Sequence, residues 1–180
     1  MPAHTLALIP ASYVLLLAPT PGPGARALLQ LRQGTGYMDG HWACGAAGHV
    51  DPGESALETA VREAREEIGV EAALADLEPL TTVHRSNEPA GAALEQRVDF
   101  FFALRRWTGE PMIREPAKTA ALEWFDLESL PSPMPPHERR VLELLAASLD
   151  GASMPAIIDL GFRAPSPRLP RRRGRHFPPR

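Results

Sequence analysis

Hydrophobic and polar positions along the chain predict a series of strands, with one helix inside the series and one after it. Strand-like runs of aliphatic, β-branched or aromatic residues occur at residues 5–18, 26–32, 79–85, 97–106 and 123–125. The first two runs are separated by Pro-Thr-Pro-Gly-Pro-Gly, which is typical of a loop joining two strands. A hairpin is therefore predicted near the start of the chain.

Two stretches carry the 3.6-residue periodicity of amphipathic helices. The first begins at Ser55, which has the spacing of a capping box with Glu58, and ends at Gly69. Its apolar stripe, expected to face a core, consists of Leu57, Val61, Ala64 and Ile68. The second helix is predicted at residues 137–149, and its apolar stripe consists of Val141, Leu144, Leu145 and Leu149.

Length and composition indicate one domain followed by a tail. A chain of 180 residues, 44% of them hydrophobic, can bury one sizeable core. From residue 150 onward the sequence is rich in proline and arginine and poor in apolar residues, so we do not expect it to bury enough surface to become ordered. We predict a domain over residues 1–149 and a disordered tail over residues 150–180.

Cysteine content and apolar segments bear on the compartment of the protein. The single Cys44 allows neither an internal disulfide nor a site built from several thiolates, which fits a reducing cytoplasm. The apolar stretch Leu6–Ala18 is interrupted by Pro10 and is too short to span a bilayer. We predict a cytoplasmic protein without a membrane partner.

The formal net charge of -3 conceals an asymmetry between the domain and the tail. The last thirty residues hold seven arginines against one aspartate, which leaves the domain clearly acidic. The run Arg171–Arg173 has the charge to contact nucleic-acid phosphates. A solvated end explains the same composition more simply, so nucleic acid is not a predicted partner.

The first predicted helix carries an acidic cluster on a flank separate from its apolar stripe. Glu63, Glu66 and Glu67 are neighbours there, and like charges at this spacing destabilise a helix by roughly 0.2 to 0.5 kcal/mol per pair. Arg62 has the spacing to bridge Glu58 and Glu66, but one arginine does not neutralise the cluster. A divalent cation that prefers oxygen ligands, such as Mg²⁺, would complement it. On the helix alone, a solvated charged face is the competing interpretation.

The residues around this helix resemble a complete Nudix box. Residues 48–70 contain a glycine, five residues, a glutamate, seven residues and then Arg-Glu-Ala-Arg-Glu-Glu-Ile-Gly-Val. Every position that the motif specifies is filled, and the motif spans 23 residues, so a chance match is improbable. The chain is therefore identified as a member of the Nudix hydrolase family of MutT-like proteins.

The resemblance implies both a fold and an activity. The expected fold is an α/β/α sandwich with a central mixed β-sheet. The expected activity is Mg²⁺-dependent hydrolysis, with Mn²⁺ as an alternative, of a diphosphate linkage in a nucleoside diphosphate linked to another group X. By the resemblance, Arg62 holds a carboxylate in place, and the cation ligands are the carbonyl group of Gly48 and the side chains of Glu63, Glu66 and Glu67.

Two further glutamates are candidates for supporting roles. Glu54 matches an earlier glutamate of the family, although an acid favoured at a helix N-terminus explains it equally well. Glu115 follows Trp107–Pro111 and Arg114, a stretch similar to one that delivers an additional glutamate to the metals in members that cleave nucleoside triphosphates. A solvated loop acid is the alternative for Glu115.

Candidate substrate-binding residues come from the loop before the box and from a later strand. Tyr37 and Trp42 have rings that could stack on a nucleobase, although packing within the protein is the commoner role of such residues. His84 and Arg85 are placed near the same pocket, and no histidine spacing suggests zinc.

The predicted partner is a small nucleotide-like substrate, and the oligomeric state, including a homodimer, stays open. The leading hypothesis is a pyrophosphohydrolase that converts a nucleoside triphosphate into the monophosphate and pyrophosphate. The alternatives are an ADP-ribose or sugar-nucleotide pyrophosphatase and a non-catalytic domain that senses nucleotides. The intact set of glutamates argues against the last, because a pure binder does not need all of them.

Overall fold

The computed structural model describes residues 7–22, 24–86 and 96–162. Within them the order of elements is β1 Ile9–Pro19, β2 Ala25–Arg32, β3 Trp42–Cys44, β4 Ala46–His49, α1 Ala56–Ile68, the 3₁₀ turn η1 Leu74–Asp76, β5 Leu77–Ser86, β6 Gln96–Leu104, β7 Thr119–Asp126, α2 Pro136–Leu149 and β8 Ile157–Leu160. Both helices and the five strands expected from the sequence are present. The short strands β3, β4 and β8 were not predicted.

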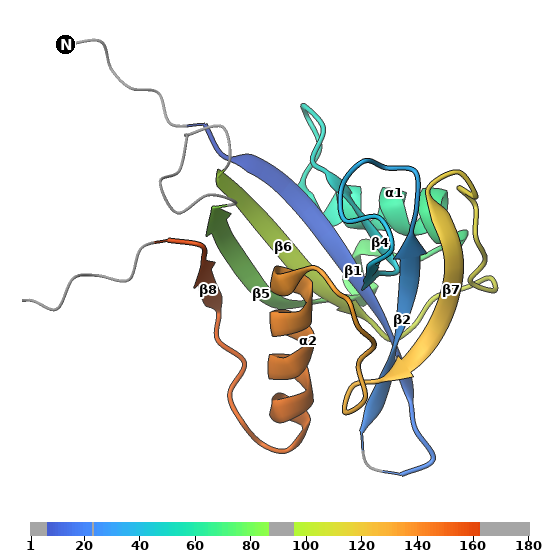
Figure 1. The fold of residues 1–180 in the computed structure, drawn as a ribbon, viewed down its shortest axis with the longest axis vertical. Helices are drawn as coiled ribbons and strands as arrows, with labels where there is room; N and C mark the ends of the chain where they lie inside the picture. Colours follow the sequence, from blue (N-terminus) through green and yellow to red (C-terminus); the bar gives the residue numbers. More distant parts are fainter. Residues whose placement is uncertain (1–6, 23, 87–95, 163–180) are drawn as a thin grey trace, which may run out of the picture.

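The strands form one mixed sheet, in which β1 is the central element (Figure 1). β1 runs parallel to β6 on one side. On its other side, its first half pairs with β4 and its last residues pair with β2, both antiparallel. The predicted hairpin of β1 and β2 is therefore confirmed. Because β4 takes over the edge of β1, β2 diverges from β1 and the sheet opens between them.

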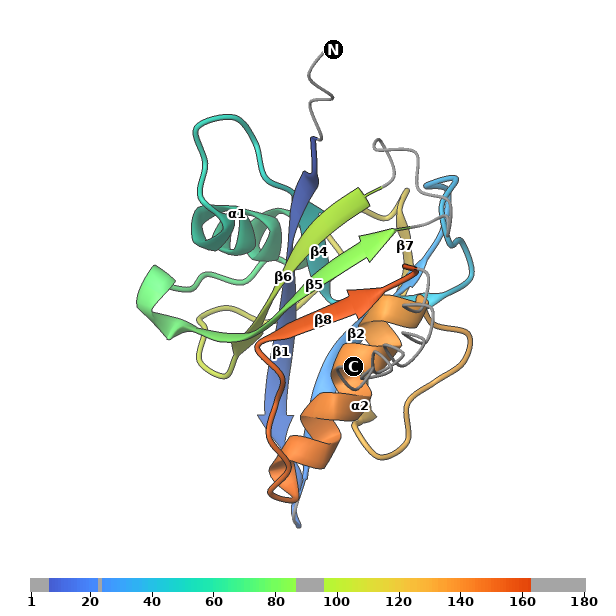
Figure 2. The ribbon, with the colours of Figure 1, turned by 90° about the vertical axis from the view of Figure 1, so that its left-hand side faces the viewer.

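The two helices pack against opposite faces of this sheet, as the alternation of side chains along β1 dictates (Figure 2). The odd-numbered Tyr13, Leu15 and Leu17 belong to the core that α2 covers. The even-numbered Val14 and Leu16 belong to the core that α1 covers. The expected α/β/α sandwich is confirmed.

Helix α1 begins and ends where the sequence predicts. The Ser55 side chain accepts the backbone N–H of Glu58, and the Glu58 side chain accepts the backbone N–H of Ser55. Gly69 adopts the left-handed conformation, with φ 72°, and its N–H bonds to the last carbonyl groups of the helix. Both ends are set by local hydrogen bonds, which explains why local sequence signals located them.

The buried face of α1 differs from the predicted stripe. Ala64 and Ile68 of that stripe are buried as predicted, but Leu57 is 36% exposed and Val61 is only partly buried, while Thr59 and Ala60 are buried in addition. The helix is turned so that the side carrying Glu63 and Glu67 lies against β4. Small alanines let the helix approach the sheet closely, and the Ser12 hydroxyl donates to the carbonyl of Ala56 at 2.7 Å.

The predicted domain boundary at residue 149 also requires correction. Residues 157–160 form β8, which pairs in parallel with β5 at the edge of the sheet. Ile158 is 9% exposed and joins the core that α2 covers. The partly buried Leu160 packs against the same core, and β5 supplies the strand's backbone hydrogen bonds. Residues 163–180, where the remainder of the predicted tail lies, are outside the described residues.

Neither of the helices in the described ranges combines the length and apolar character needed to cross a membrane.

Candidate active site

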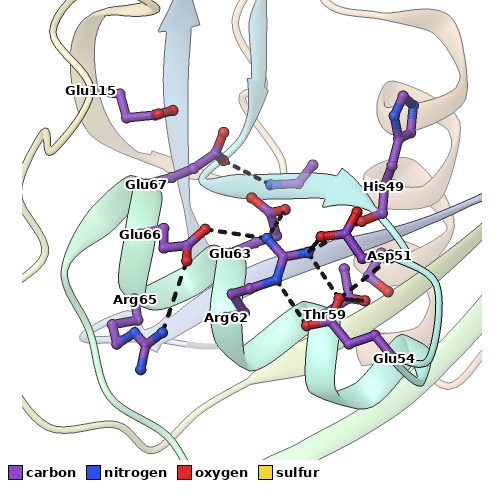
Figure 3. A network of polar contacts seen from close by, with 12 residues as sticks. His49, Asp51, Glu54, Thr59, Arg62, Glu63, Arg65, Glu66, Glu67 and Glu115 are labelled. Atoms are coloured by element: carbon purple, nitrogen blue, oxygen red, sulfur yellow. Dashed lines mark hydrogen bonds and ion pairs between the residues drawn. The ribbon is translucent and has the colours of Figure 1, made fainter.

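Arg62 lies at the centre of a network that organises the acidic side of α1 (Figure 3). Its Nε and Nη2 donate to the two carboxylate oxygens of Glu54 at 2.8 and 2.9 Å. Its Nη1 donates to Glu63 at 2.6 Å and to Glu66 at 3.2 Å. The predicted bridge to Glu58 is not formed, because the Glu58 carboxylate caps the helix instead. Arg62 thus links the loop before the helix to two glutamates of the cluster.

Glu54 is a fixed partner of Arg62. Hydrogen bonds from Arg62, and one from Thr59 Oγ1 at 2.7 Å, lower the pKa of Glu54 to about 2. The carboxylate therefore stays ionised and keeps the guanidinium in one orientation. Of the two interpretations of Glu54, the geometry favours the supportive one over that of an acid favoured only by the helix dipole.

The Glu63 carboxylate packs directly against the backbone of Gly48. A Cβ atom built on Gly48 would lie 1.8 Å from Glu63 Oε1, so only glycine leaves room for the carboxylate. Burial raises the pKa of Glu63, while the hydrogen bond from Arg62 opposes the rise. The box glycine and this box glutamate, 15 residues apart, are therefore in contact.

Glu67 is the most perturbed acid of the cluster. Its Oε2 accepts the backbone N–H of Ala47 at 2.9 Å and is 3.4 Å from Gln30 Nε2. Burial, together with the nearby charges of Glu63 and Glu115, raises the pKa of Glu67 to about 7. A carboxylate with a pKa near neutrality can accept a proton at physiological pH.

Glu66 and Glu115 complete the set of predicted acids. The Glu66 side chain is 48% exposed and reaches Arg62. Glu115 lies on the loop between β6 and β7, on the far side of Glu67 from Glu66 (Figure 3). Both of its oxygens are 2.9 Å from Lys118 Nζ, a residue that the sequence did not single out.

The donor set suits a divalent cation, although no site is preassembled. Among the described residues, no group of three His, Cys, Asp or Glu side chains converges closely enough to hold a metal ion by itself. Arg62, Arg65 and Lys118 are cationic partners of the surrounding acids, which are Glu54, Glu63, Glu66, Glu67 and Glu115. Negative charge is in excess, and together with burial, which is the larger cause, it raises the pKa of Glu67. A hard cation with oxygen ligands relieves that excess, so the residues present fit Mg²⁺ or Mn²⁺.

A pH dependence of stability follows from Glu67. Its folded-state pKa of about 7 exceeds the ordinary value of 4.5, so the folded protein holds this proton more tightly than the unfolded chain does. The stabilisation is complete below pH 4.5 and is lost as the pH rises through 7. We expect the free energy of unfolding in EDTA to fall by about 2 kcal/mol through this group. Thermal unfolding between pH 5 and 8 measures the fall, and Glu67→Gln should flatten it; an unchanged slope in that variant would contradict the assignment.

A cleft of about 350 Å³ opens beside the cluster, where β2 diverges from β1. Two predicted substrate-binding residues, Tyr37 and Arg85, line it. Residues that the sequence did not indicate also line it, including Gln30, Arg32, Arg97, Lys118 and Glu138. The cleft therefore has Glu67 of the cluster at one side and cationic side chains around it, an arrangement suited to a polyphosphate chain held through cations.

Trp42 and His84, the other two predicted substrate-binding residues, are not part of this cleft lining. Trp42 packs against Phe125 with ring centroids 4.7 Å apart, as in the alternative of simple packing. His84 precedes Arg85 on β5, so the two side chains point to opposite faces of the sheet. The His84 ring lies 4.6 Å from that of Phe162.

The floor of the cleft contains buried polar groups from the sheet and from helix α2. Arg85 forms a buried ion pair with Asp99. Glu138, from the first turn of α2, accepts the backbone N–H of Cys44, and burial raises the pKa of the Glu138 carboxyl. Because Glu138 also lines the cleft, it can offer a hydrogen-bonding group to a ligand. Its position in an otherwise amphipathic helix gave no sequence signal for this role.

Comparisons with known proteins bear on the family and the fold of the chain. The NUDIX domain family profile matches residues 10–145. The crystal structure of a MutT NUDIX hydrolase from Burkholderia pseudomallei is similar, with a TM-score of 0.61 and 28% identity, covering 74% of this chain and 96% of that chain. The crystal structure of a C. elegans Ap4A hydrolase binary complex has a TM-score of 0.59 and 20% identity, covering 81% and 100% of the two chains, a likeness of fold alone.

One curated relative matches over a short stretch. Mouse bis(5'-nucleosyl)-tetraphosphatase [asymmetrical] is 66% identical over 32 residues, which are 18% of this chain. The matched stretch spans 21% of the mouse protein, about a fifth of its length.

Proposed function

The chain belongs to the Nudix family, and from that premise we propose that it hydrolyses nucleoside triphosphates to the monophosphate and pyrophosphate with Mg²⁺ or Mn²⁺. Nudix hydrolases act on nucleoside diphosphate derivatives, so the coarse reaction is cleavage of a diphosphate linkage. The observation that carries the finer proposal is the approach of Glu115 to Glu67 beside a cleft lined by Arg32, Arg97 and Lys118.

The proposal gives each acidic residue a role. Glu63, Glu66, Glu67 and the carbonyl of Gly48 would hold the cation, whose chemistry is to neutralise phosphate oxygens and to lower the pKa of the attacking water. Glu67 or Glu115 accepts the proton of that water. Arg62, fixed by Glu54, sets the position of the Glu63 carboxylate.

The cationic residues around the cleft orient the phosphate chain. Lys118 is a donor to Glu115 and can donate to a phosphate oxygen from the same position. Arg32 lies on β2 and Arg97 lies on β6, so the phosphate chain of the substrate would be held between these two strands. The nucleobase would then extend along the cleft toward Tyr37 and the floor near Glu138.

A dinucleoside tetraphosphate is the second candidate substrate. The identity with the mouse tetraphosphatase over 32 residues favours it. ADP-ribose and sugar nucleotides remain the third class to test. The cytoplasmic location expected from the cysteine content stays a prediction.

A panel assay distinguishes these substrates. Nucleoside triphosphates, diadenosine tetraphosphate and ADP-ribose are incubated with the full chain and Mg²⁺ or Mn²⁺, and the products are separated by chromatography. We expect a nucleoside triphosphate to give the highest kcat/KM, with pyrophosphate rather than phosphate released. Faster cleavage of the tetraphosphate would replace the leading candidate with the second. Equal rates for the native protein and Glu67→Gln on every substrate would overturn the proposal.

A further inference from the structure

Gln30 lies between the acidic cluster and the start of β7. It is on β2 and is 4% exposed. Its Nε2 is 3.4 Å from Glu67 Oε2, and its Oε1 accepts a hydrogen bond from Thr119 Oγ1. Thr119 is 6% exposed and begins β7, which pairs with β2. A buried chain of three side chains therefore runs from β7 through β2 to helix α1.

Glu67 selects the orientation of the Gln30 amide, and Thr119 stabilises that orientation. An ionised Glu67 can only accept hydrogen bonds, so the NH₂ group of the amide must face it. The amide oxygen then faces Thr119, whose hydroxyl can donate to it. The reversed amide would place two oxygens in contact at Glu67. The hydrogen bond from Thr119 thus stabilises Gln30 in the orientation that Glu67 requires.

The consequence concerns the two oxygens of Glu67. Oε2 receives the backbone N–H of Ala47 and faces the amide of Gln30. Within the ranges that the structure covers, Oε1 has no hydrogen-bond donor, and it points away from β4 on the side of Glu115 (Figure 3). The protein therefore holds the Glu67 carboxylate through Oε2 and leaves Oε1 available to a ligand.

We propose that Gln30, oriented by Thr119, is a positioning residue for the divalent cation, because it holds Oε2 of Glu67 and leaves Oε1 as the ligand. This inference rests on the proposed function, since it requires a cation at Glu67. Partners that hydrogen-bond a ligating group typically change metal affinity by about 10- to 100-fold when they are removed. Gln30 and Thr119 lie outside the sequence motif, so only their contacts reveal this role.

Calorimetric titration of the full chain with Mn²⁺, without substrate, tests the proposal. Gln30→Met keeps the side-chain length and removes both polar groups, and we expect it to weaken Mn²⁺ binding about tenfold. Thr119→Val removes only the hydroxyl, and we expect a loss of about threefold. Thr119→Ser restores a hydroxyl and should return the affinity to within about twofold of the native value.

A matched control separates this role from loosening of the loop that carries Glu115. Gln33 Nε2 donates to the carbonyl of Pro116 at 2.8 Å, which anchors the same loop. Gln33 does not hydrogen-bond to Glu67 and does not line the cleft. Gln33→Met should therefore bind Mn²⁺ like the native protein. If Gln33→Met lost as much Mn²⁺ affinity as Gln30→Met, the proposal would be overturned, because loosening of the Glu115 loop would then explain both losses.

The remaining outcomes are also decisive. Thermal unfolding in EDTA identifies a variant that does not fold. If Gln30→Met does not fold, the comparison of Thr119→Val with Thr119→Ser tests the proposal. Native-like Mn²⁺ affinity in folded Gln30→Met and Thr119→Val would refute the positioning role while leaving the proposed hydrolase intact. Absence of Mn²⁺ binding by the native protein, with and without nucleotide, would instead refute the proposed function.

Discussion

Replacing Glu67 with glutamine is expected to lower kcat by about a thousandfold while leaving the fold unchanged. Glutamine keeps an oxygen that can accept the backbone N–H of Ala47, so the contact between α1 and β4 survives. It removes the negative charge and the capacity to accept a proton, which are the properties that the proposed reaction uses. The measurement is kcat at saturating Mg²⁺ with the best substrate of the panel, together with the thermal midpoint.

Glu66→Gln should also remove most turnover, because Glu66 belongs to the same proposed ligand set. Glu71→Gln provides the control, since the exposed Glu71 lies just beyond the helix, is absent from the cleft lining and pairs with Thr108 only through its backbone. Its kcat should match that of the native protein. Near-native turnover by folded Glu67→Gln would show that the proton acceptor and the cation ligand lie elsewhere.

Gly48→Ala is expected to lower both kcat and Mn²⁺ affinity by at least about tenfold. The added Cβ would fall 1.8 Å from Glu63 Oε1, so the carboxylate must leave its place against β4. The displaced group is the end of a flexible side chain, so the free energy of unfolding should change much less than the activity. Steady-state kinetics, Mn²⁺ calorimetry and thermal unfolding together measure this separation.

Gly22→Ala is the matched control for the Gly48 substitution. A Cβ on Gly22 meets no atom within 4 Å, and its backbone is outside the left-handed region. This variant should keep native Mn²⁺ affinity and turnover. If Gly48→Ala behaved in the same way, the packing of Glu63 on Gly48 would have no part in the site.

The arrangement of charges explains why a helix with so many neighbouring glutamates is compatible with folding. Arg62 pairs with Glu54, Glu63 and Glu66 at once, and the Glu54 pair is two-pronged. Glu67 forms no such ion pair among the described residues, and burial, with the nearby charges of Glu63 and Glu115, raises its pKa. The ionisation of Glu67 is therefore unfavourable in a carboxylate that lines the cleft, where a cation can stabilise the charge.

The sequence by itself determined the features that depend on local interactions. The capping box of Ser55 and Glu58 and the left-handed Gly69 place both ends of α1, because each involves hydrogen bonds within a few residues. The loop rich in proline and glycine defined the hairpin of β1 and β2. The spacing of the box placed Glu63, Glu66 and Glu67 on one flank of the helix, because helical geometry alone makes them neighbours.

Only the tertiary structure decided which distant residues meet. Arg62 bonds to Glu54 instead of Glu58. The β8 segment pairs with the edge strand β5, although its own composition did not predict a strand. Trp42 and His84 turn away from the cleft, while Lys118 and Gln30 reach it. These outcomes depend on strand register, on the rotation of α1 about its axis and on competition among many partners for each polar group. Residues close together in the chain do not determine any of these features. They are determined only when the strands of the whole sheet come together.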